Sequence, residues 1–76
     1  MSNLSQDLTA AISAIHDADA QDLVTAAKAI LHGEPNDATD FAIDVLASEA
    51  RDRIEYGDDP DPMLADVLAI RAEYFS

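Results

Sequence analysis

The stretch from Asp37 to Tyr56 constrains the fold most, because its twenty residues contain no glycine or proline and its apolar residues recur with the period of an α-helix. Asn36 and Asp37 are N-cap candidates, and Gly57 ends the pattern. The apolar residues sweep well over half of the helix circumference: Ala38, Phe41, Ala42, Ile43, Val45, Leu46, Ala47, Ala50 and Ile54. An ordinary surface helix needs a narrower stripe. We therefore predict a central helix that touches neighbours on two or three sides.

Two more helices are predicted before this one. The first spans residues 4–16 and has one apolar face made of Leu4, Leu8, Ala11, Ile12 and Ile15. The second follows an N-cap at Asp19 and has a stripe made of Leu23, Val24, Ala27, Ile30 and Leu31. A break over residues 17–19 separates them, because a continuous helix would carry the apolar stripe onto Asp19 and Asp22. The alternative is one bent helix over 4–31, since no Gly or Pro intervenes. Gly33 is predicted to end the second helix in a left-handed conformation.

A fourth helix is predicted at the C-terminal end of the chain. Asp61 is its expected N-cap, Pro62 its first residue and Phe75 its approximate end. Apolar residues occupy so much of its circumference that it either seals the bundle or leaves a strip for a second chain, which would make a homodimer. The predicted fold is all-α: a compact bundle of four short helices, or of three if the first two fuse, in a single acidic domain over residues 1–76.

The charge of the chain excludes several classes of partner. Sixteen acidic residues stand against four basic ones, so the formal net charge is −12. Direct binding to nucleic acid or to an anionic membrane is not expected, because both would repel this surface. No apolar run approaches the roughly 20 residues that span a bilayer, the N-terminus lacks the pattern of a signal peptide, and there are no cysteines. We therefore predict a cytoplasmic protein.

No motif for catalysis, a cofactor or a metal is found. His16 and His32 each lie in the last turn of a predicted helix, where the helix dipole favours a cation, and their spacing matches no zinc pattern. Asp58, Asp59 and Asp61 do not have the spacing of a calcium loop, and turn formation and helix capping explain them. There is no nucleophile elbow and no Gly-rich phosphate loop. The sequence therefore predicts no enzyme, no cofactor and no metal site.

The acidic residues themselves are the candidate binding residues. Asp40 and Asp44 lie one helical turn apart and have no basic residue at i±4, whereas Glu49–Arg53 and Arg51–Glu55 are i,i+4 pairs of opposite sign. The unbalanced acids therefore lie in the first half of the central helix and at the adjoining turns. The predicted partner-binding residues are Asp37, Asp40, Asp44, Asp17, Asp19, Asp22, Asp58 and Asp59.

These features lead to a functional hypothesis. Duplex DNA carries about 14 charges over the length of a helix of ~16 residues, which is the same order as the net charge here. We predict a small acidic, non-enzymatic protein that inhibits or regulates a basic, nucleic-acid-binding protein. In size, acidity and lack of catalytic motifs it is similar to phage-encoded DNA mimics of the anti-CRISPR or anti-restriction kind, and to toxin-neutralising immunity proteins and antitoxins. The alternative is an assembly subunit of a halophilic cell that dimerises through its C-terminal helix. A third interpretation is an acidic surface that only keeps the chain soluble.

Overall fold

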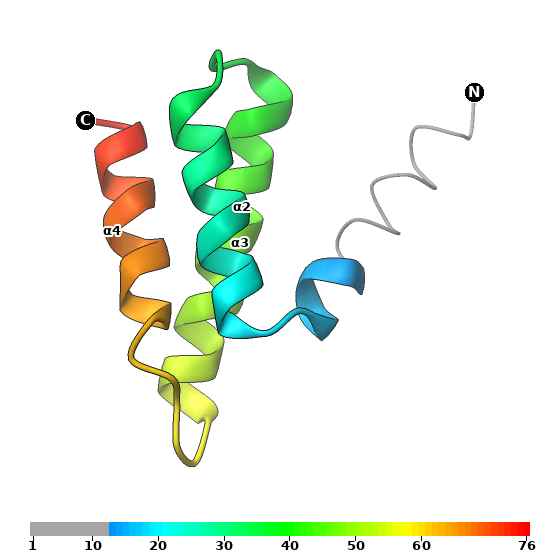
Figure 1. The fold of residues 1–76 in the computed structure, drawn as a ribbon, viewed down its shortest axis with the longest axis vertical. Coiled ribbons are helices and arrows are strands. Elements are labelled where there is room, and N and C mark those ends of the chain that lie inside the picture. Colours follow the sequence, from blue (N-terminus) through cyan, green and yellow to red (C-terminus); the bar gives the residue numbers. More distant parts are fainter. Residues whose placement is uncertain (1–12) are drawn as a thin grey trace.

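The computed structural model describes residues 13–76, which fold as an α-helical bundle without strands in that range (Figure 1). Its complete helices are α2 (Ala20–His32), α3 (Asp37–Tyr56) and α4 (Leu64–Tyr74), and residues 13–17 are also helical. The chain runs up α2, down α3 and up α4, so consecutive helices are antiparallel. The predicted all-α bundle is confirmed. The beginning of the first predicted helix, with Leu4, Leu8, Ala11 and Ile12, lies outside the described residues.

The predicted break between the first two helices is confirmed, and the fused helix is wrong. The helical turn 13–17 ends at Asp17, and α2 begins at Ala20. Between them, Ala18 N–H donates to Ile15 O over 3.2 Å. Asp19 is the N-cap of α2, because its Oδ1 accepts the N–H of Asp22 at 2.9 Å.

Helix α3 has the predicted bounds, and Asn36 is its N-cap. The Asn36 side chain accepts the Thr39 N–H at 3.0 Å, while the Thr39 hydroxyl accepts the Asn36 N–H at 2.8 Å. This reciprocal capping box fixes the helix start. Three neighbours contact α3, as predicted: α2, α4 and the helical turn 13–17.

The apolar arc of α3 is nevertheless buried on one face only. Its buried residues are Ile43, Leu46, Ala47 and Ala50. Phe41 stays 47% exposed and Ile54 39% exposed. Part of the apolar arc therefore stays exposed within the described residues, because α2 and α4 pack against each other as well as against α3.

The core lies where α2, α3 and α4 meet. Its largest fully buried side chains come from all three helices: Leu23, Ile43, Leu46, Leu64 and Val67. The predicted stripe of α2 is confirmed, with its first three members buried and Ile30 and Leu31 packed at the edge. Within residues 13–76 no helix combines the length and the apolar character needed to cross a lipid bilayer.

The left-handed termination predicted at Gly33 is wrong. Gly33 has φ −93° and ψ −176°, which is extended backbone. Its N–H donates to Ile30 O at 3.2 Å, so a tight last turn satisfies that carbonyl without a left-handed residue. Gly57 is also extended, and its N–H donates to Arg53 O at 2.9 Å.

The two glycines should respond differently to alanine. A Cβ on Gly57 would collide with the backbone oxygen of Arg53, which has no room to move, whereas a Cβ on Gly33 would approach Ala29 O only to 3.4 Å. We expect Gly57→Ala to lower the free energy of unfolding by more than about 1 kcal/mol, and Gly33→Ala to leave it unchanged or raise it by about 0.4–1 kcal/mol. Urea denaturation followed by circular dichroism measures both. Equal effects would contradict the assigned termination of α3.

Helix α4 begins at Leu64, later than predicted, and its assigned N-cap is Met63 without a side-chain cap. Asp61 still closes the preceding turn, because its Oδ1 accepts the Met63 N–H at 2.9 Å and its backbone O accepts the Leu64 N–H at 3.0 Å. Residues 62–63 thus form a tighter turn in front of the α-helix. Asp61 as the N-cap and Pro62 as the first α-helical residue are therefore wrong, although the Asp61 side chain does accept a backbone N–H of the turn that precedes the helix.

Candidate functional site

The eight aspartates predicted to bind a partner do not form one group in the structure. Asp37 is the first residue of α3, at the end where α2 finishes. Asp58 and Asp59 follow the last residue of α3, at the end where α2 and α4 begin (Figure 1). A helix of 20 residues is about 30 Å long. The eight residues therefore cannot be engaged together by one small basic groove.

Asp40 is held by α4. The phenol of Tyr74 donates to Asp40 Oδ1 at 2.6 Å, and the hydroxyls of Tyr74 and Thr39 lie 2.6 Å apart. Burial of the phenol, followed by its hydrogen bond to the Asp40 carboxylate, raises the Tyr74 pKa above its usual value. This network joins the first turn of α3 to the last turn of α4.

Asp44 is also held by α4. Arg71 Nε donates to Asp44 Oδ1 at 2.6 Å, and the guanidinium of Arg71 lies 4.8 Å from the centre of the Phe75 ring. Asp40 and Asp44, which have no basic residue at i±4 on their own helix, therefore have their partners on α4. Helical spacing along α3 could not reveal their partners, because both lie on another helix. Replacing these aspartates would disturb the packing of α4 as well as any recognition.

A second group of carboxylates gathers at the opposite end, and we call it the acidic end: Asp19, Asp58, Asp59 and Asp61. Together with Gly57 and Leu64 these residues line an open cleft of about 370 Å³. All four aspartates are exposed, and none forms an ion pair within residues 13–76. Asp19 and Asp61 accept backbone N–H groups, so only Asp58 and Asp59 have no side-chain hydrogen bond in this part of the chain. Asp22 lies in the first turn of α2, next to this cluster.

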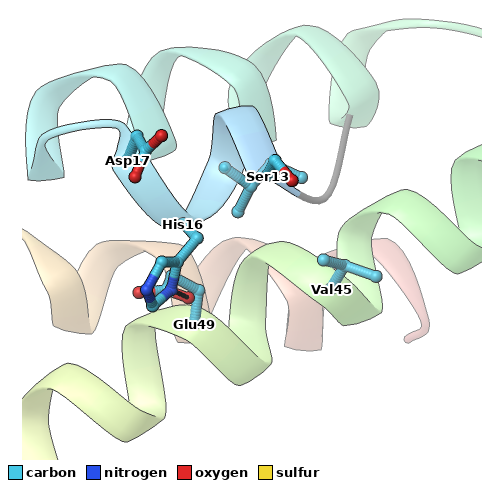
Figure 2. Close-up of a pocket in the computed structure, with 6 residues that line it drawn as sticks. Ser13, His16, Asp17, Val45 and Glu49 are labelled. Atoms are coloured by element: carbon cyan, nitrogen blue, oxygen red, sulfur yellow. Dashed lines mark hydrogen bonds and ion pairs between the residues drawn. The ribbon is translucent and has the colours of Figure 1, made fainter. Parts of the chain in front are cut away.

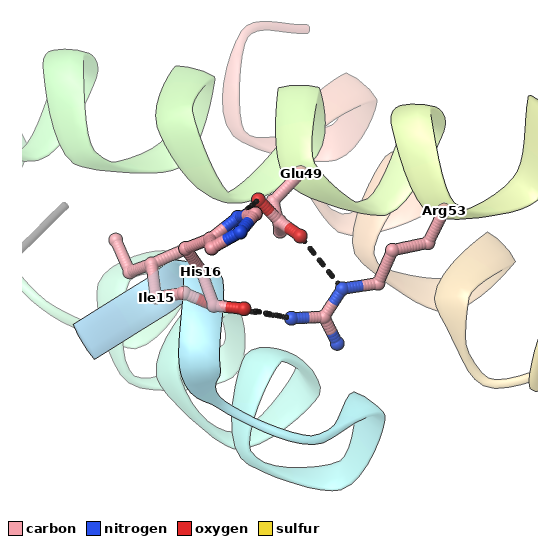
Figure 3. Close-up of polar contacts among 4 residues, drawn as sticks. All are labelled: Ile15, His16, Glu49 and Arg53. Atoms are coloured by element: carbon pink, nitrogen blue, oxygen red, sulfur yellow. Dashed lines mark hydrogen bonds and ion pairs between the residues drawn. The ribbon is translucent and has the colours of Figure 1, made fainter. Parts of the chain in front are cut away.

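Arg53 lines the same cleft but is engaged elsewhere. Its Nε donates to Glu49 Oε2 at 2.7 Å, and its Nη2 donates to the carbonyls of His16 at 2.9 Å and of Ile15 at 3.3 Å (Figure 3). A hydrogen bond of 3.1 Å joins His16 Nδ1 to Glu49 Oε1. We call these contacts of His16, Glu49 and Arg53 the clamp. The clamp caps the C-terminal end of the helical turn 13–17 and fixes it against α3.

The clamp also sets the ionisation of Glu49. Burial of its carboxylate raises the pKa, but the hydrogen bonds from Arg53 and His16 outweigh burial and hold the pKa below its usual value. The predicted Glu49–Arg53 pair is thus confirmed and has a tertiary role as well. The predicted Arg51–Glu55 pair is not formed in the structure of residues 13–76, where both side chains are exposed.

Asp17 lies apart from Asp40 and Asp44 and also from the acidic end. It lines an open groove of about 330 Å³ between the helical turn 13–17 and α3, together with Ser13, His16, Val45 and Glu49 (Figure 2). His32 is the last residue of α2 and is exposed, as predicted for a helix C-terminus. Across residues 13–76 no three His, Asp or Glu side chains converge in a way that could hold a metal ion.

Comparisons of the chain with protein-family models, with curated proteins and with solved structures found no match. The site is therefore described by its own geometry. Sequence reasoning found the acids of the acidic end but missed the partners of Asp40 and Asp44. It also missed the tertiary contacts of Arg53, since the short-range charge pattern explains only its bond to Glu49.

Proposed function

We propose that this chain is a small acidic, non-enzymatic cytoplasmic protein that binds a basic, nucleic-acid-binding protein and occupies its nucleic-acid site. The observation that supports this proposal best is the acidic end. It presents four exposed carboxylates around one cleft, and no ion pair among the described residues neutralises them. Such a cluster attracts a basic partner over a distance and speeds its association.

The proposed recognition surface is smaller than the set of aspartates that the sequence predicted. Asp40 and Asp44 already bind Tyr74 and Arg71, so their charges serve the packing of α4 against α3. The acidic end replaces them as the proposed contact surface. Asp58 and Asp59 are its most informative members, because neither side chain makes a hydrogen bond to the described residues that a substitution would break.

The alternative, a halophilic subunit that dimerises through α4, has less support. Helix α4 directs Leu64, Val67 and Ile70 into the bundle, so these side chains are not available to a second chain. Circular dichroism in dilute buffer separates the two functions. A halophilic domain should lose its structure as salt is withdrawn, whereas a charge mimic should stay folded, and only its binding should respond to salt.

The test of the proposed function is charge reversal at two matched pairs of exposed acids. Asp58→Lys with Asp59→Lys changes the net charge from −12 to −8, as does Asp66→Lys with Glu73→Lys on α4. A basic protein captured from lysate by the wild-type chain is purified, and its affinity and its displacement by duplex DNA are measured between about 50 and 200 mM salt. We expect the first variant to bind at least about tenfold more weakly, through slower association, and the second to bind nearly as the wild type does.

Three results would contradict the proposal. Equal binding by both variants would remove the acidic end as the contact surface. If duplex DNA does not compete with the chain for the basic protein, the nucleic-acid site of that protein is not the target. Binding that does not weaken with salt would remove charge as the basis of recognition.

A further inference from the structure

Arg53 is the one basic residue that lines the cleft at the acidic end, among the residues that the structure describes. The other lining residues are the four aspartates of the acidic end and uncharged residues. A guanidinium beside carboxylates that no other cation neutralises is strongly attracted to them. Nevertheless, Arg53 forms no ion pair with any of these aspartates within residues 13–76. Its separation from them therefore has a structural cause.

The clamp supplies this cause. All three hydrogen bonds of the Arg53 guanidinium go to other groups: Glu49 Oε2 at 2.7 Å, His16 O at 2.9 Å and Ile15 O at 3.3 Å (Figure 3). The side chain of Arg53 is 25% exposed and that of Glu49 is 16% exposed. A charge-assisted bond that is partly shielded from water is stronger than a bond to an exposed carboxylate. The clamp therefore fixes the positive charge of Arg53 on Glu49 and on the turn.

The clamp depends on Glu49 and on the helical turn 13–17. Each oxygen of the Glu49 carboxylate has its own contact, Oε1 with His16 Nδ1 and Oε2 with Arg53 Nε. The turn contributes two of the three acceptors of Arg53. Displacement of the turn, or loss of the Glu49 carboxylate, would free the guanidinium while it still lies beside the acidic end.

We propose that the clamp regulates the acidic end by holding the charge of Arg53 away from it. With the clamp closed, the four aspartates keep their full negative charge for a basic partner. With the clamp open, the Arg53 side chain turns into the cleft and pairs with Asp58 or Asp59, and a basic partner has to displace it. This inference rests on the proposed function, because it describes the regulation of the same surface.

Binding of a fluorescent hexalysine peptide at low ionic strength tests the proposal without the natural partner. Glu49→Met opens the clamp. Glu55→Met is the matched control, because Glu55 is exposed on α3 and forms no ion pair within residues 13–76. Glu55 is also six residues nearer than Glu49 to Asp58 in sequence, so loss of charge alone would weaken binding at least as much at Glu55. We expect Glu49→Met to weaken binding at least about threefold more than Glu55→Met does.

The double variant Glu49→Met with Arg53→Met identifies the cause of this loss. It keeps the net charge of −12, because one acidic and one basic residue are removed. Without Arg53 no basic side chain in the wall of the cleft can enter it, so binding should return to within about twofold of the wild-type affinity. A loss that persists without Arg53 would overturn the proposal, and so would equal losses in Glu49→Met and Glu55→Met.

Nuclear Overhauser spectroscopy follows the Arg53 side chain directly. It compares the wild type with Glu49→Gln, which keeps the shape of the side chain, removes its charge and replaces Glu49→Met in the peptide measurement if that variant does not fold. We expect contacts of Arg53 with His16 in the wild type and with Pro60, which lines the cleft, in the variant. An Arg53 side chain that stays beside His16, or that has no contact in the cleft, would overturn the proposal.

The two measurements distinguish a failure of this inference from a failure of the proposed function. If hexalysine binds Asp58→Lys with Asp59→Lys as tightly as it binds the wild type, the acidic end is not a surface for basic partners, and the proposed function fails. The position of the Arg53 side chain is measured without any partner, so it decides the inference about the clamp in that case too.

Discussion

Ile43→Ala is expected to lower the free energy of unfolding by about 2–5 kcal/mol, the largest effect among the predictions made for this protein. Ile43 is fully buried in the cluster formed by α2, α3 and α4, so its truncation removes apolar contacts and leaves a cavity. A domain of this size has a total stability near the lower end of about 5–15 kcal/mol. A loss near the upper end of the range expected for Ile43→Ala should leave the variant partly unfolded at room temperature. Urea and thermal denaturation followed by circular dichroism measure the loss.

Ile54→Ala is the matched control for this prediction. It makes the same change of side chain on the same helix, with the same gain in helix propensity, at a residue that is 39% exposed. We expect a loss of less than about 1 kcal/mol, because surface substitutions usually stay within about 0.5 kcal/mol. A loss as large as that of Ile43→Ala would mean that Ile54 is covered in solution.

Arg53→Met is expected to cost about 2 kcal/mol of stability. The substitution keeps an apolar stem but removes three hydrogen bonds, one to the Glu49 carboxylate and two to the carbonyls that end the helical turn 13–17. Bonds to charged groups contribute about 1.5–3 kcal/mol, and a buried group left without its partner adds a penalty. Arg51→Met is the control, because Arg51 is exposed on the same helix and makes no ion pair within residues 13–76.

The difference in stability between the wild type and Arg53→Met should depend on pH, because it involves the carboxylate of Glu49. Its folded pKa lies below the usual value of 4.5, so the carboxylate contributes stability above that pH and loses the contribution as the pH falls through the folded pKa. The difference between the wild type and Arg53→Met should therefore shrink on acidification. A difference that stays constant from pH 7 to about pH 3 would contradict an ionic clamp. Arg51→Met should show no such change relative to the wild type.

The sequence alone identified most of the helices, because each is marked by local chemistry. Asn36 and Gly57 bound α3 as predicted, and Asp19 and Asp22 form the start of α2. Caps and hydrophobic periodicity depend on neighbours within four residues, so they can be read without tertiary structure. The exceptions are local as well: the tight turn before Leu64 delays α4, and an extended Gly33 ends α2.

The candidate site could be predicted only in part. Asp58 and Asp59 were identified from an excess of acid in a turn, and in the structure they lie beside Asp19 at the acidic end. Their grouping needed the fold, because Asp19 is 39 residues from Asp58 and the two meet only when the start of α2 packs near the end of α3. Charge counting could not show this arrangement.

By itself, the sequence determined the helical class, the bounds of α3, the break at Asp19 and a large excess of acidic over basic residues. Only the tertiary structure decided which aspartates are bonded to another helix. Asp40 and Asp44 have no partner within reach along their own helix, yet Tyr74 and Arg71 reach them from α4, more than 25 residues away in sequence. Helical periodicity specifies which residues share a face, but the packing of one helix against another decides which charge that face meets.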